Sequence, residues 1–119
     1  MKTLSVLERQ VMEIVWKNGE CSVRDVIKIQ NRKKKLAYTT IATILTRLYD
    51  KGLVSREIHK TRICYLPKIS KAAYGKNTAI HFIRKFFNSF GDTAIASFAE
   101  SIDRLPDAKK KYLLKLLKK

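Results

Sequence analysis

The hydrophobic period of this chain changes once, after Gly52, and that change limits the fold more than any other feature. Before Gly52, apolar side chains recur every three or four positions, which is typical of amphipathic helices. After it, residues 53–59 and 62–67 are rich in β-forming side chains, and Lys60-Thr61 separates them. Two such runs around a short connection predict a β-hairpin with a basic tip. The expected fold class is therefore mainly α with a small β-hairpin.

Capping signals predict where the first two helices begin. Ser5 and Glu8 form an S-x-x-E capping box before an apolar stripe, and Asn18-Gly19 is a stop signal for that helix. Ser22 and Asp25 have the same spacing, with Asp in the reciprocal position. A second helix is therefore expected to begin there and to end before a polar, basic connection.

A third helix is predicted from Tyr38-Thr39 to Lys51, with Gly52 ending it. Successive residues of a helix are rotated by 100° about its axis, so the apolar side chains of this segment fall on one face and its threonine hydroxyls fall on the opposite face. The predicted buried stripe is Ile41, Ile44, Leu45 and Leu48. The opposite face carries Thr39, Thr43 and Thr46, with Arg47 at its edge.

Three helices and a hairpin within residues 1–68 are the element order of a winged helix-turn-helix. In that fold the second and third helices form the turn motif, and the third lays its outer face in the major groove of DNA. The hairpin is the wing, whose basic tip reaches phosphate or the minor groove. Residues 1–68 are therefore predicted to be a winged-helix DNA-binding domain.

Residues 69–119 are predicted to form a helical dimerisation region. A long helix capped by Ser70 should run to about Phe90, a shorter one should follow Gly91-Asp92, and Pro106 should begin the last. Five phenylalanines fall between residues 82 and 98, more than a small appendage buries alone. Because a second copy could cover them, we expect a two-fold homodimer. The interface candidates are Ile80, Ile83, Phe87, Phe90, Phe98, Leu113, Leu116 and Leu117.

The chain has 26 Lys and Arg against 10 Asp and Glu, a net charge of +16. Residues 1–68 hold 15 basic and 6 acidic side chains, and residues 69–119 hold 11 and 4. A charge of this size favours a polyanionic partner, with nucleic acid first and an anionic membrane surface second. No apolar run approaches the roughly 20 residues of a spanning helix, and the N-terminus lacks a secretory signal. We therefore expect a cytoplasmic protein without a membrane partner.

The candidates for contact with base edges are Thr39, Thr40 and Thr43, near the start of the third helix. The alternative for Thr39 is that it only caps that helix. Cationic side chains around the same helix and the wing are candidates for contact with phosphates, or else form a solvated surface. The Tyr38 hydroxyl is a further candidate for phosphate contact, and the alternative for Tyr38 is packing at the start of the helix. The candidates for phosphate contact are Lys33, Lys34, Lys35, Tyr38, Arg47, Lys51, Lys60 and Arg62.

No residue pattern points to catalysis, a metal or a cofactor. Cys21 and Cys64 lie far apart without a CxxC context, so free thiols are expected, with a single disulfide as the alternative. His59 and His81 stand alone, without ligand spacing and without a visible partner. No catalytic triad, paired-carboxylate or phosphate-loop constellation is present, and we predict that the protein is not an enzyme.

The sequence also resembles the penicillinase-repressor family, which includes the methicillin-resistance regulators and copper-responsive repressors. The resemblance is strong over residues 4–67 and weaker through Phe90-Gly91-Asp92 and Phe98-Ala99-Glu100. The matching words in the first part are Leu4-Ser5, Glu8, Val11-Met12, Ile14-Val15-Trp16, Gly19, SVRDV at 22–26, LAYTTI at 36–41, Arg47-Leu48, KGLV at 51–54, Arg56, Arg62, Tyr65 and Pro67.

The resemblance implies a dimeric transcriptional repressor with an N-terminal winged helix, which binds an inverted-repeat operator. Our leading hypothesis is accordingly a sequence-specific repressor acting as a homodimer. The alternative is a basic architectural protein of the nucleoid type, with the same fold and little sequence preference. The operator, the regulated genes and the inducing signal do not follow from the sequence.

The sequence departs from the pattern of the family it resembles at three places. The glycine usual in the family's wing turn is replaced, since the chain reads Lys60-Thr61-Arg62. Antibiotic-responsive members are cut by a sensor protease at an Asn-Phe bond, where this chain has Ser97-Phe98. The resemblance therefore leaves open whether a regulatory protease acts on it. The cysteine-rich tail of the copper-responsive members is absent, which removes the ligands of a copper switch.

Overall fold

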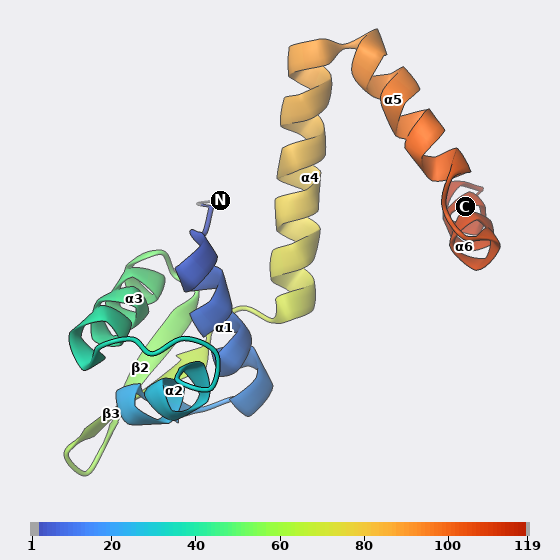
Figure 1. Ribbon diagram of the computed structural model, residues 1–119. Helices are drawn as coiled ribbons and strands as arrows, with labels where there is room; N and C mark the ends of the chain where they lie inside the picture. The colour runs from blue at the N-terminus through green and yellow to red at the C-terminus, as the bar shows by residue number, and fades with distance from the viewer. Residues whose placement is uncertain (1–2, 119) are drawn as a thin grey trace. The chain divides into compact units, whose positions relative to one another are not determined.

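The computed structural model describes residues 3–118. Over that range the protein is mainly helical, with a small antiparallel sheet of three strands (Figure 1). The chain divides into two compact units, Met1–Thr78 and Ala79–Lys119. The predicted fold class, mainly α with a small β-hairpin in a winged-helix arrangement, is confirmed.

The first unit contains the elements of the winged helix in the predicted order. They are α1 (Val6–Asn18), β1 (Cys21–Ser22), α2 (Val23–Gln30), α3 (Tyr38–Asp50), β2 (Val54–His59) and β3 (Arg62–Pro67). The strand β1 pairs with β3, so the sheet order is β1-β3-β2. The sequence did not predict β1, because a strand of two residues carries no hydrophobic period.

Both predicted capping boxes are confirmed. The Glu8 N–H donates to Ser5 Oγ at 3.2 Å, and the Ser5 N–H donates to Glu8 Oε1 at 2.8 Å. Ser22 and Asp25 exchange the same pair of bonds at 3.2 and 3.0 Å. Each cap satisfies backbone donors that the helix leaves free, and contributes about 1 kcal/mol.

The helix α3 begins and ends by different means. Its N-cap is Ala37, which makes no side-chain capping bond. Thr39 lies inside the first turn, so the alternative that Thr39 caps this helix is wrong. At the other end, Gly52 takes a positive φ of 79°. The N–H groups of Gly52 and Leu53 then reach the carbonyls of Tyr49 and Leu48, each at 3.0 Å, which is a Schellman motif.

The core of the first unit lies between the three helices and the sheet. Its largest side chains with no more than 2% exposure on α1, α2 and α3 are Val11, Met12, Val15, Val26, Ile41, Leu45 and Leu48. The buried stripe predicted for α3 is confirmed. Because burying one such side chain contributes about 1.5–3 kcal/mol, this stripe fixes which face of α3 remains outside.

The start of α4 (Lys71–Phe90) packs on α1. The indole Nε1 of Trp16 donates to the Ile69 carbonyl at 2.9 Å, and its ring lies 5.5 Å from the buried Tyr74 ring. These contacts place the first turns of α4 in the first unit. The division after residue 68 into a DNA-binding and a dimerisation part remains a prediction about function.

The second unit continues α4 and adds α5 (Asp92–Asp103) and α6 (Asp107–Leu117). As predicted, Ser70 caps α4, since its hydroxyl accepts from the Ala73 N–H at 3.0 Å. Gly91, with a φ of 53°, separates α4 from α5. The three helices after the wing are thus where the sequence predicted them.

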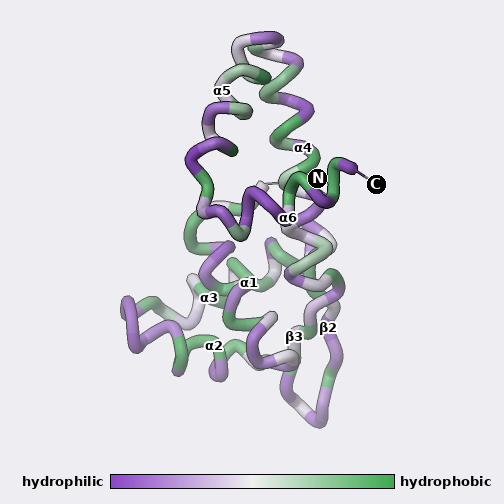
Figure 2. Tube along the Cα trace, turned by 90° about the vertical axis from the view of Figure 1, so that its right-hand side faces the viewer, coloured by the Kyte–Doolittle hydropathy of each residue, from purple (hydrophilic) through white to green (hydrophobic). Residues whose placement is uncertain are grey.

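Little apolar surface of the second unit is buried within one chain. Of the described residues after Thr78, Ala94 alone is a fully buried apolar residue. Figure 2 shows hydrophobic stretches recurring along α4 and α5 among hydrophilic ones. Phe90 is 59% exposed and Phe98 is 44% exposed. These helices therefore present apolar side chains that this chain leaves uncovered.

Candidate nucleic-acid interface

The outer face of α3 presents hydroxyl groups along a groove. Thr39 and Thr43 are exposed and Thr40 is half-buried. All three line one groove together with Arg47, against the start of α1. The structure therefore brings the three predicted base-contact residues together on one surface.

Thr46 lies further along the exposed side of α3, and its hydroxyl is bonded within the helix. Its Oγ1 donates to the Ala42 carbonyl at 2.9 Å, one turn earlier in the same helix. That bond occupies the hydroxyl proton. Thr46 is therefore a natural control for Thr43, because both are exposed threonines of the same helix.

The wing is the hairpin formed by β2, Lys60-Thr61 and β3. Its two strands pair from Val54 opposite Pro67 to His59 opposite Arg62. Lys60 adopts a φ of 61°, a left-handed conformation that favours glycine. The turn thus makes a two-residue connection with a lysine, in place of a glycine, in that conformation. Figure 2 shows the tip of the wing as hydrophilic.

Arg62 lies next to the turn at the wing tip, but its side chain is held against the N-terminus of α2. Its Nη2 donates to Ser22 Oγ at 2.6 Å and lies 3.7 Å from Asp25 Oδ1. Tyr38, whose side chain is exposed, lines the same surface hollow as Arg62. The structure therefore brings these two candidates for phosphate contact together beside the N-terminus of α2.

A cation–π contact joins the wing to α3. The guanidinium carbon Cζ of Arg56 lies 3.7 Å from the centroid of the Tyr49 ring. Such a contact is weak at an exposed site. It couples the orientation of β2 to that of α3.

Lys33, Lys34 and Lys35 lie in the exposed connection between α2 and α3. The backbone there is tied by a turn, in which the N–H groups of Lys33 and Lys34 both reach the Gln30 carbonyl at 3.0 Å. The Asn31 side chain accepts from the Leu36 N–H at 3.3 Å. The run of lysines is therefore presented from a structured loop.

Lys51 lies at the end of α3, and its ammonium group is already used. Its Nζ donates to both carboxylate oxygens of the buried Glu8, at 2.9 and 2.8 Å, and to the Thr3 carbonyl at 3.1 Å. Burial alone would raise the pKa of Glu8, but the hydrogen bonds from Lys51 and Ser5 outweigh it and hold that pKa below its ordinary value. Glu8 therefore balances the charge of Lys51 within the fold. Contact of Lys51 with phosphate remains a prediction.

His59 has partners that sequence reasoning missed. Its Nε2 lies 2.9 Å from Glu20 Oε1 and 3.1 Å from Glu57 Oε2. Cys64 lies beside them, and burial together with Glu20 raises the pKa of its thiol. The expectation that His59 lacks a partner is therefore wrong, because Glu57 lies two residues away on the same strand and the fold brings Glu20 to it from the segment before β1. Both cysteines are free, as the leading hypothesis for them expected.

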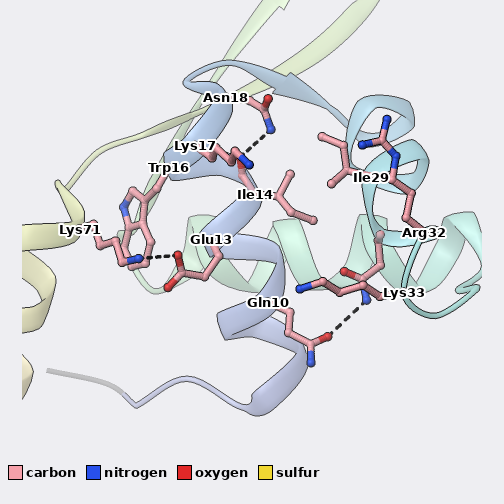
Figure 3. Close-up of a pocket in the computed structure, with 11 residues that line it drawn as sticks. Gln10, Glu13, Ile14, Trp16, Lys17, Asn18, Ile29, Arg32, Lys33 and Lys71 are labelled. Carbon is pink, nitrogen blue, oxygen red and sulfur yellow. Dashed lines mark hydrogen bonds and ion pairs between the residues drawn. The ribbon is translucent and has the colours of Figure 1, made fainter.

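A second hollow lies between α1 and α2, and Figure 3 shows the charged and polar side chains around it. Lys71 Nζ donates to Glu13 Oε2 at 2.8 Å, and Gln30 Nε2 donates to Gln10 Oε1 at 3.3 Å. Within residues 3–118, no buried side-chain nitrogen or oxygen is left without a partner. Two pairs of polar side chains that line the hollow are therefore hydrogen-bonded to each other.

The comparisons with known proteins agree with this geometry. The family model described as "Penicillinase repressor" matches residues 4–119. The chain belongs to the penicillinase repressor family. One curated member, the penicillinase repressor of Bacillus licheniformis, is 26% identical over 98 residues, which cover 82% of this chain and 77% of that protein. The methicillin resistance regulatory protein MecI of Staphylococcus aureus is 27% identical, over 87% of this chain and 85% of its own length.

Solved structures of penicillinase repressor family members resemble the winged helix. The DNA-binding domain of the repressor BlaI is 30% identical with a TM-score of 0.54, over 62% of this chain and 94% of that structure. The monomeric form of Bacillus licheniformis BlaI, in complex with the blaP half-operator, is 29% identical with a TM-score of 0.52, over 61% and 89% of the two chains.

Two further observations concern the Ser97-Phe98 bond and the expectation that no helix spans a membrane. The Ser97-Phe98 bond lies inside α5, where the Ser101 hydroxyl donates to the Ser97 carbonyl at 2.9 Å. In residues 3–118, no helix combines the length and the apolar character that crossing a membrane requires.

Proposed function

We propose that this chain is a transcriptional repressor that binds double-stranded DNA sequence-specifically, as a homodimer on an inverted-repeat operator. The observation that carries the proposal is the exposed threonine face at the start of α3, which is flanked by cationic side chains. The membership of this chain in the penicillinase repressor family and the half-operator complex of the BlaI relative support the proposal.

Base reading is assigned to Thr39, Thr40 and Thr43. A threonine hydroxyl donates to or accepts from base edges, and its methyl group contacts the thymine methyl in the major groove. The N-terminal half of α3 enters the groove in this proposal, because that half carries these residues and lacks acidic side chains. Asp50, at the far end of α3, would repel phosphate and stays outside.

Phosphate contacts are assigned to side chains on either side of that helix. Lys33, Lys34 and Lys35 precede it, Arg47 lies on its exposed edge, and Lys60 is at the tip of the wing. Tyr38 and Arg62 line one hollow and would reach the backbone together. Such contacts set the register of the protein on the duplex, and they make its affinity fall steeply with salt.

A homodimer is supported by the apolar surface of the second unit. The Phe87 and Phe98 rings lie 6.0 Å apart, edge to face, and the Phe86 and Phe90 rings lie 5.1 Å apart. Ile80, Ile83, Leu116 and Leu117 add exposed apolar area, and Leu113 is half-buried. A two-fold axis through this surface would place two copies of α3 on half-sites about one DNA turn apart.

The deciding experiment selects binding sites for the full chain from a random DNA pool. Its affinity is then measured at one salt concentration for the selected palindrome, for the palindrome with one half scrambled, and for random DNA. We expect the palindrome to bind about a thousandfold more tightly than random DNA. Scrambling one half should remove most of that advantage. A ratio near one would reject sequence-specific repression.

The second candidate is a basic architectural protein with little sequence preference. The observation that favours it is the charge of residues 69–119, which carry 11 basic and 4 acidic side chains outside the reading helix and the wing. This candidate predicts equal affinity for all three duplexes above. Salt dependence alone does not separate the two, because both release counterions on binding.

A further inference from the structure

Three side chains of metal-ligating types converge on one face of the three-stranded sheet. Glu20 precedes β1, His59 ends β2 and Cys64 lies within β3. One ligand atom from each lies within 4.8 Å of the other two. We propose that Glu20, His59 and Cys64 form a binding site for Zn²⁺ or a cation of the same class, with Glu57 as the fourth ligand.

The sheet register explains why these residues meet. Cys64 lies opposite Glu57 of β2 on one side and opposite Ser22 of β1 on the other. Because side chains two apart on a strand share a face, Glu57 and His59 lie on the face that also carries Cys64. Glu20 reaches the same face from the residue before β1. Strand pairing thus brings together residues that the sequence keeps far apart.

The donor set fits a zinc-class cation. Imidazole nitrogen, thiolate sulfur and carboxylate oxygen are its protein ligands, at about 2.0–2.3 Å in a tetrahedral arrangement. Ligand atoms around one such ion are therefore separated by about 3.3–3.8 Å. His59 Nε2 already faces both carboxylates, at 2.9 and 3.1 Å. Glu20, Glu57 and His59 are exposed, so side-chain rotation suffices to admit the ion.

The charges at this place also favour a cation. Glu20, Glu57 and nearby Asp25 are three of the chain's 10 acidic residues. Arg62 faces them from β3, but it is engaged with Ser22 and Asp25. On binding, Cys64 releases its proton to solvent and the thiolate ligates the ion. Two carboxylates and one thiolate then more than offset the charge of a divalent ion, while Asp25 offsets the charge of Arg62.

Such an ion would hold both strands of the wing to the segment before β1. It would therefore fix the angle of the wing relative to α2, which follows β1 directly. The site uses none of the residues assigned above to base reading. Its existence does not depend on the proposed repressor function.

The test is a titration of the untagged, metal-free full chain with Co²⁺, followed by displacement with Zn²⁺. We expect one ion per chain, a thiolate-to-cobalt charge-transfer band and the visible bands of a tetrahedral site. Zn²⁺ should bleach these bands. Absence of the thiolate band, or binding only as scattered weak sites, would overturn the proposal.

Matched variants identify the ligands. Cys64→Ser should abolish the charge-transfer band, and Glu20→Gln and His59→Ala should each weaken Co²⁺ binding at least about tenfold. Cys21→Ala and His81→Ala, which change the other cysteine and the other histidine, should leave the band intact. Glu20 is exposed, so Glu20→Gln reports on the site even where Cys64→Ser disturbs the fold. Equal losses in the ligand and control variants would overturn the assignment.

Discussion

The ammonium group of Lys51 donates to both carboxylate oxygens of Glu8, and so joins the end of α3 to the first turn of α1. The Glu8 side chain is 6% exposed and the Lys51 side chain is 22% exposed. Glu8 also completes the capping box with Ser5. One carboxylate therefore both starts α1 and anchors the helix that carries the proposed reading face.

Lys51→Met should destabilise the protein by about 2–3 kcal/mol. The substitution leaves the Glu8 carboxylate buried without its cation, and the partial exposure of Lys51 keeps the loss below that of a fully buried pair. Urea unfolding of the full chain measures it. Lys71→Met is the matched control, because its ion pair with Glu13 is exposed and should contribute less than about 1 kcal/mol. Equal losses would show that the Glu8 pair is no stronger than a surface pair.

The free energy of unfolding should decrease as the pH is lowered, because the Glu8 carboxylate becomes protonated. The folded pKa of Glu8 lies below its ordinary value of 4.5, so its contribution is present above that value and is lost as pH falls through the folded pKa. Glu13 and Asp25 have lowered pKa values as well and contribute in the same direction. The free energy of unfolding, measured from about pH 7 to about pH 3, should therefore decrease. In Glu8→Gln that decrease should be smaller; an unchanged slope would assign it to other groups.

The sequence predicted the elements that local signals determine. Each capping box forms between two residues three positions apart, Ser5 with Glu8 and Ser22 with Asp25. Gly52 ends α3 because glycine readily adopts the positive φ found there. The hairpin followed from its two β-rich runs. These features need no knowledge of the rest of the fold, so they can be predicted from a single sequence.

What the sequence did not predict depends on tertiary pairing. Glu8 and Lys51 are 43 positions apart, and nothing local indicates that an acidic residue of a capping box is buried. Glu20 becomes a neighbour of His59 only through the pairing of the strands, whereas Glu57 lies two residues away on the same face of β2 and could have been predicted from strand alternation. The face of α3 was predictable from its period, whereas the bond from the Thr46 hydroxyl to the Ala42 carbonyl depends on a side-chain rotamer that the period does not determine.

Lys60→Gly should separate the backbone role of the wing turn from its charge. A lysine at a φ of 61° costs about 1 kcal/mol relative to glycine, so the substitution should raise stability by up to that amount. It also removes a cation from the wing tip, so affinity for DNA should fall and the salt slope should decrease by about one. Thermal unfolding and a salt titration measure the two effects. Lys60→Ala, which removes the charge but keeps a side chain, should lose affinity without gaining stability.

Thr43→Val should lower affinity for the selected operator by about 1–3 kcal/mol and leave affinity for random DNA unchanged. The substitution keeps the shape of the side chain but removes the hydroxyl from the groove along α3. Thr46→Val is the control, because its hydroxyl is bonded to the Ala42 carbonyl. Fluorescence anisotropy on both duplexes measures the ratio. Equal losses on operator and random DNA would remove Thr43 from base reading.

Phe87→Asp should convert the proposed dimer to monomers in sedimentation velocity. A carboxylate in place of a half-buried ring that contacts Phe98 would be desolvated in an apolar interface, with a loss of about 2–4 kcal/mol in association. Ser89→Asp places the same charge at an exposed position of α4 and should leave the dimer intact. Phe90 is 59% exposed, so Phe90→Asp repeats the test with little loss of packing within one chain. If both phenylalanine variants remain dimers with unchanged helicity, the interface lies on another surface, and the two-fold placement of α3 must be built from there.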